Sequence, residues 1–60
     1  MSAARKEALA QLRVAVASAF EARPNTPEWQ QAHRTVALAQ VHALDAGATA
    51  AEILDASEGF

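Results

Sequence analysis

The sequence predicts an all-α protein: an antiparallel helical hairpin followed by a short third helix. Two observations predict it. Apolar residues recur every three or four positions through two segments of similar length, and a Pro-Asn-Thr-Pro turn at positions 24–27 separates those segments. Alanine, the strongest helix former, supplies 17 of the 60 residues, which favours helix throughout. We therefore expect one small helical domain over residues 1–60.

The first helix is expected over residues 3–22, with Ser2 as its N-cap. Its apolar side chains fall within an arc of about 80° when successive residues are turned by about 100°; they are Leu9, Leu12, Val16 and Phe20. Pro24 ends the helix, because the residue before a proline is disfavoured in the α conformation.

The second helix is expected over residues 27–46. Thr26 precedes a proline and is therefore extended, as an N-cap must be, and Pro27 suits the first helical position, where no N–H is needed. Gly47 is a typical residue just beyond a helix C-terminus. Two helices of similar length, each roughly 30 Å, joined by a short loop, predict an antiparallel hairpin.

A third helix is expected over residues 50–57 and is predicted to pack across the open end of the hairpin. Thr49 and Glu52 have the spacing of a capping box, in which each side chain binds the backbone N–H of the other residue. Gly59 is expected to end this helix.

The second helix carries apolar residues on more than one side, and one partner helix cannot cover them all. We therefore expect a homodimeric helix bundle. The predicted contacts between chains are Trp29, Val36, Leu38, Val41 and Leu44. Trp29 is also expected to be largely buried beside Phe20. The alternative is a monomeric three-helix bundle in which the second helix is central.

No motif for catalysis, cofactor binding or metal binding is found in the sequence. There is no cysteine, and His33 and His42 are nine residues apart, which places them on opposite faces of one helix. Ser18 and Ser57 have no base nearby in the sequence. The chain also has neither a secretory leader pattern nor an apolar stretch long enough to span a bilayer, so we expect a cytoplasmic protein that is not an enzyme.

The charge is unevenly distributed. All five basic residues precede position 35, and four acidic residues follow it, although the net charge is only −2. Arg5, Lys6 and Arg13 are therefore the candidate contacts for an anionic partner.

One short segment resembles a known motif. Ala43, Gly47 and Ile53 have the A-x3-G-x5-I/V spacing found in bacterial helix-turn-helix regulators. The resemblance implies two helices joined by a glycine turn, with the second helix reading DNA. However, residues 50–57 contain no Arg, Lys, Asn or Gln to contact a base or a phosphate, so nucleic acid is a disfavoured partner.

Together these features predict a non-enzymatic protein–protein interaction module. We expect a small homodimeric regulatory or accessory protein of bacterial, plasmid or phage origin, with itself and possibly another protein as partners. The alternative is a nucleic-acid-associated regulator that uses the helix-turn-helix-like tail.

Overall fold

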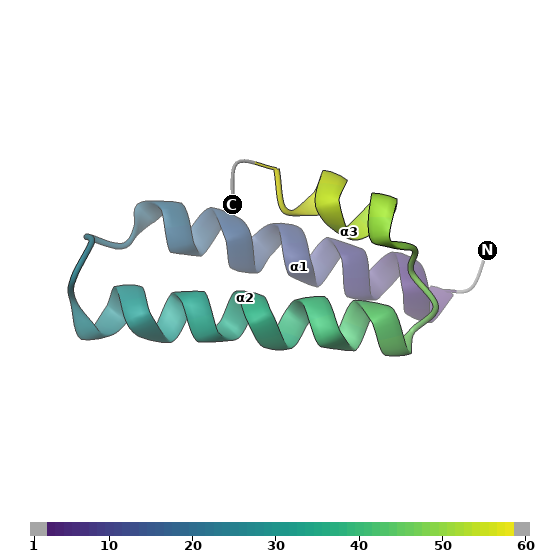
Figure 1. The fold of residues 1–60 in the computed structure, drawn as a ribbon, viewed down its shortest axis with the longest axis horizontal. Coiled ribbons are helices and arrows are strands. Elements are labelled where there is room, and N and C mark those ends of the chain that lie inside the picture. The colour runs from purple at the N-terminus through teal and green to yellow at the C-terminus, as the bar shows by residue number, and fades with distance from the viewer. Residues whose placement is uncertain (1–2, 59–60) are drawn as a thin grey trace.

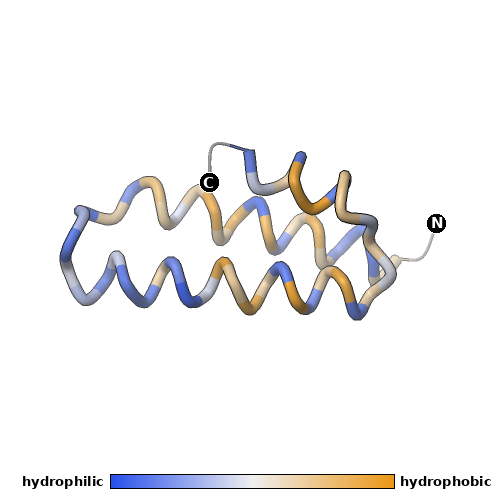
Figure 2. Tube along the Cα trace, viewed as in Figure 1, coloured by the Kyte–Doolittle hydropathy of each residue, from blue (hydrophilic) through white to orange (hydrophobic). Residues whose placement is uncertain are grey.

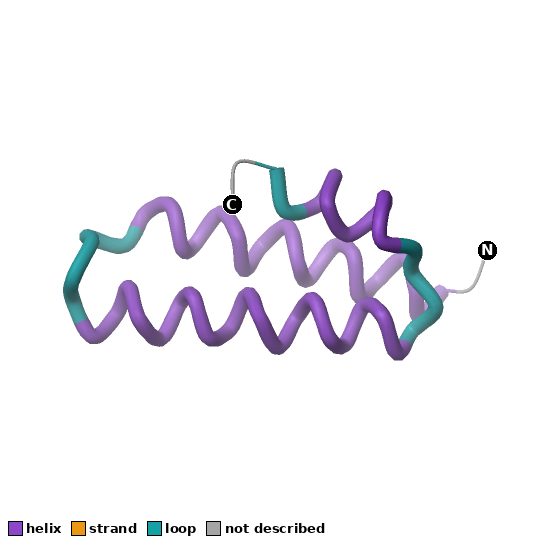
Figure 3. Tube along the Cα trace, in the orientation of Figure 1, coloured by secondary structure: helices purple, strands orange, loops and turns teal. Residues whose placement is uncertain are grey.

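A computed structural model of the chain describes residues 3–58 and contains three helices. They are α1 (Ala3–Glu21), α2 (Pro27–Asp45) and α3 (Ala50–Ala56). Helices α1 and α2 lie side by side in opposite directions, and α3 folds back over them (Figures 1 and 3). The predicted all-α hairpin with a short third helix is confirmed. Each helix ends one residue before its predicted limit. The predicted N-cap Ser2 and the predicted stop Gly59 lie outside the described residues.

The turn between α1 and α2 is built around Thr26. Its backbone is extended, with φ −106° and ψ 161°, and its Oγ1 accepts a hydrogen bond of 3.1 Å from the N–H of Trp29. The same hydroxyl donates to the carbonyl oxygen of Arg23 at 2.7 Å. One side chain therefore joins the beginning of the turn to the first turn of α2, where Pro27 needs no hydrogen bond.

The turn between α2 and α3 depends on Gly47, whose φ is +96°, a value that residues with a side chain rarely adopt. The capping box that follows is complete. Thr49 N–H donates to Glu52 Oε1 at 2.9 Å, and Glu52 N–H donates to Thr49 Oγ1 at 3.2 Å. These bonds satisfy donors that a helix as short as α3 would otherwise leave unpaired.

Helix α1, rather than α2, is the most buried element. It contributes six of the buried apolar residues, which are Ala8, Leu9, Leu12, Ala15, Val16 and Ala19. Helix α2 contributes only Val36 and Ala43. The physical reason is that α1 packs against both other helices, whereas α2 meets α1 along one side and α3 only near its C-terminal half. Of the monomeric alternative, the central position of the second helix is therefore wrong, whereas its monomeric state stays untested.

Helix α3 does not close the open end of the hairpin as predicted, but runs back along it. Arg5 Nη1 lies 3.7 Å from Glu52 Oε1, and Arg13 Nη2 donates to Asp55 Oδ2 at 3.2 Å. On the other side of α3, Gln40 Nε2 of α2 donates to Ser57 Oγ at 3.2 Å. These contacts hold α3 over the junction between the long helices, where Ile53 and Ala56 are buried.

Trp29 is partly buried at the start of α2. Its ring contacts that of His33, one turn along the helix, with centroids 3.9 Å apart and the ring planes tilted by 47°. Phe20 is 60% exposed, and the predicted packing of Trp29 beside it stays a prediction.

Candidate interaction surface

Several large apolar side chains remain exposed after the three helices have packed. Six of them have between 56% and 73% of their surface in contact with solvent: Val14, Phe20, Leu38, Val41, Leu44 and Leu54. Three of the six, Leu38, Val41 and Leu44, lie within a stretch of seven residues of α2. We call these three residues the outer stripe. The concentration of apolar surface on one short segment distinguishes it from the scattered exposure that any small protein shows.

Helical geometry places the outer stripe away from the core. Val36 points into the contact with α1 and is only 1% exposed. Taking Val36 as the reference, Leu44 lies about 80° around the helix, Val41 about 140° and Leu38 about 160° in the other sense. The exposure of all three side chains, at 56% or more, shows that neither α1 nor α3 covers them. In Figure 2 the apolar residues of α2 are concentrated in its C-terminal half, while its first turns are hydrophilic.

The predicted contact residues therefore fall into three groups. Leu38, Val41 and Leu44 are exposed together on the outer stripe. Val36 is a correction: it belongs to the core of the single chain and has no surface to offer a second one. Trp29 is partly buried against its own helix and lies at the opposite end of α2 from the stripe.

Leu54 of α3 is a further exposed apolar side chain that was not predicted as a contact. Glu52 and Asp55 face α1 through their ion pairs, whereas Ser57 bonds to Gln40 of α2. Leu54 lies about 160° from the buried Ala56 around α3 and is 73% exposed. Because Ile53 and Leu54 are adjacent in the sequence, periodicity alone does not say which of them is buried. Only the direction in which α3 packs decides that Ile53 is buried and Leu54 is exposed.

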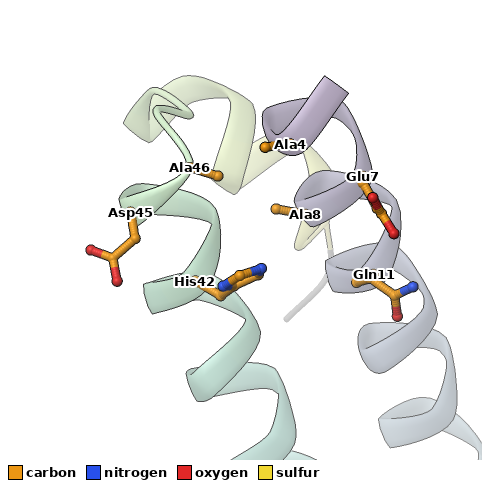
Figure 4. Close-up of a pocket in the computed structure, with 7 residues that line it drawn as sticks. All are labelled: Ala4, Glu7, Ala8, Gln11, His42, Asp45 and Ala46. Atoms are coloured by element: carbon orange, nitrogen blue, oxygen red, sulfur yellow. The ribbon is translucent and has the colours of Figure 1, made fainter. Parts of the chain in front are cut away.

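A groove between α1 and α2 is lined in part by ionisable side chains. It has a volume of about 390 Å³ and is lined by Ala4, Glu7, Ala8, Gln11, His42, Asp45 and Ala46. In Figure 4 the His42 ring extends across the groove toward α1, while the carboxylates of Glu7 and Asp45 point away from it. The groove thus does not bring an acid and a base together as proton transfer requires. Within residues 3–58 no three His, Asp or Glu side chains gather where they could hold a metal ion.

Two of the three basic residues predicted to contact an anionic partner form ion pairs within the chain. Arg5 and Arg13 pair with Glu52 and Asp55 of α3, and only Lys6 of this set is outside those ion pairs. The pKa of the Glu52 carboxyl is lowered, mainly by the hydrogen bond from the Thr49 N–H and further by the charge of Arg5. The acidic tail therefore neutralises much of the positive charge that a phosphate would need.

The helix-turn-helix-like spacing does correspond to a turn between two helices. Ala43 and Ile53 are buried, and Gly47 has the positive φ that the turn requires. Helix α3, however, has only seven residues and directs Glu52 and Asp55 toward α1. The segment thus has the turn that the resemblance implies, together with a second helix that carries no basic side chain.

Among the described residues, no helix has the length and apolar character needed to cross a membrane. Comparison with known proteins finds no matching protein family, no matching curated protein and no matching solved structure. Any inference about function therefore rests on the residues that the chain itself exposes.

Proposed function

We propose that this chain is a non-enzymatic protein–protein interaction module, a small cytoplasmic regulatory or accessory protein that functions as a homodimer. The observation that carries the proposal is the outer stripe of α2, where Leu38, Val41 and Leu44 are all more than half exposed. Covering such side chains is favourable by roughly 25 cal/mol for each Å² removed from water. A folded chain gains this free energy when the surface of a partner covers those side chains.

The size of the core supports the same proposal. Leu12 and Val36 are the only large side chains among the described residues that are almost completely buried, and small alanines make up most of the remaining core. Domains below roughly 70–80 residues are marginally stable unless metals, disulfides or partner chains add to them. A second chain on α2 supplies apolar burial that the single chain lacks.

Two matched valine substitutions test the proposal. Val41 lies in the outer stripe and is 57% exposed, while Val14 is similarly exposed, at 62%, but lies on α1. Val41→Ser removes apolar surface from both halves of a symmetric contact, so we expect the dimer dissociation constant to rise at least about tenfold. Val14→Ser makes the same chemical change outside the stripe and should leave association unchanged.

Size-exclusion chromatography with light scattering gives the mass of each variant over a range of concentrations, and circular dichroism checks that both remain helical. Equal association by the two variants would show that the outer stripe is not the contact surface.

The second candidate function is a nucleic-acid-associated regulator. The observation that favours it is the positive φ of Gly47, which fits the turn implied by the helix-turn-helix resemblance. Binding titrations with duplex DNA at about 50 and 200 mM salt separate the two functions, since phosphate contacts weaken steeply as salt rises. Tight, sequence-selective and salt-dependent binding would favour the regulator over the interaction module.

A further inference from the structure

We infer that the outer stripe is covered by the α2 helix of a second copy running in the opposite direction, with Arg34 of each chain facing Asp45 of the other. This inference rests on the proposed function and deepens it by specifying the occupant and its register.

Four residues form a single line on the exposed side of α2. Arg34, Leu38, Val41 and Asp45 are separated by four, three and four residues. At about 100° per residue they fall within roughly 60° of one another and lie opposite Val36, which faces α1. The line has a basic residue at one end, two exposed apolar residues in the middle and an acidic residue at the other end.

This order is complementary to itself when reversed. A twofold axis midway between positions 39 and 40 places Leu38 of one copy opposite Val41 of the other, and Arg34 opposite Asp45. Both apolar residues are then covered and both charges meet an opposite charge. A parallel alignment would instead place Arg34 beside its own copy and Asp45 beside its own copy, which is repulsive. Charge therefore selects the antiparallel direction.

The two charged residues are available for this role. Both are exposed, and neither takes part in the ion pairs that hold α3 to α1. Asp45 is moreover the last residue of α2, where a negative charge is unfavourable to the helix because the C-terminal end of the helix dipole is negative. The stability of the isolated helix does not account for an acid at this position, whereas pairing with Arg34 of a second copy does.

The residues beside the line fit the same register. Ala37 and Leu44 flank it on the side where α3 lies, and both are exposed. The twofold axis brings Leu44 of one copy close to Ala37 of the other, so a large side chain packs over a small one. The apolar and charged positions thus agree on one symmetric arrangement, and this agreement favours a second copy over an unrelated protein.

Charge reversal tests the register. Arg34→Glu and Asp45→Arg each convert two attractive contacts of the dimer into two repulsive ones, so each variant alone should dimerise about tenfold more weakly than the wild type. An equimolar mixture of the two variants restores opposite charges at both contacts, and association should return to within about threefold of the wild type. Arg23→Glu changes net charge by the same amount as Arg34→Glu but lies in the turn, so it should have no effect on dimerisation.

Sedimentation equilibrium measures all four samples and the wild type, with circular dichroism confirming helicity. If the wild type dimerises but the single reversals associate as well as Arg23→Glu, the antiparallel register is wrong and the proposed function stands. If mixing fails to restore association, Arg34 and Asp45 do not face one another and the register is also wrong. A wild type that remains monomeric at about 1 mM, a concentration at which even weak dimers form, would overturn both the register and the proposed function.

Discussion

Leu12 is the side chain whose truncation should damage this fold most. It is 0% exposed and sits on α1, the helix that packs against both others. Replacing a buried leucine with alanine costs about 2–5 kcal/mol, from lost apolar burial and the cavity left behind. A chain of this length is expected to have a total unfolding free energy of only about 3–9 kcal/mol, so Leu12→Ala should remove much or all of it.

Urea or thermal unfolding followed by circular dichroism at 222 nm measures this loss. Leu54→Ala is the matched control, because it makes the same chemical change at a site that is 73% exposed and should change the unfolding free energy by no more than about 0.5 kcal/mol in dilute solution. If Leu12→Ala is no more damaging than Leu54→Ala, α1 is not the centre of the core.

Two further predictions concern the connection to α3. Gly47→Ala should lower the unfolding free energy, measured by urea titration, by about 1–2 kcal/mol, because φ is +96° at this position. Crowding is not the cause, since no heavy atom lies within 4 Å of the added methyl group. Gly47→Asn should cost less in the same titration, because Asn tolerates positive φ better. Because the pKa of Glu52 is lowered, its ionised form contributes stability above the ordinary pKa of 4.5, and this contribution is lost as the pH falls through the lower folded-state pKa. The difference in unfolding free energy between wild type and Glu52→Gln should therefore shrink over that acidic range. A constant difference would show that the capping box and Arg5 do not stabilise the carboxylate.

Much of the local structure was predictable because it depends on neighbouring residues. Thr26 followed by Pro27 specifies a helix start through steric restriction and one hydrogen bond, and Thr49 with Glu52 does the same for α3. Gly47 marks the end of α2 because few other residues adopt its backbone conformation.

The errors arose where long-range packing decides the outcome. The apolar pattern of α2 is broad enough to suggest a central helix, yet α3 packs mainly on α1, where Ile53 and Ala56 are buried and Glu52 and Asp55 pair with Arg5 and Arg13. Val36 was predicted to lie in a contact between chains, but it is buried within the single chain. Sequence periodicity does not show which apolar face of α2 packs against the neighbouring helix.

The alanine-rich composition also hides the candidate surface. Small side chains allow α1 and α2 to pack closely through several different faces, so the sequence alone leaves their relative rotation open. Once the structure fixes that rotation, Leu38, Val41 and Leu44 are exposed together on α2.

Sedimentation equilibrium of the unmodified protein tests the central claim most directly. The chain mass is 6.3 kDa, and self-association through α2 predicts an apparent mass that rises from this value toward twice this value as the concentration increases through the micromolar range to about 1 mM. A mass that stays at 6.3 kDa over the whole range would contradict the account.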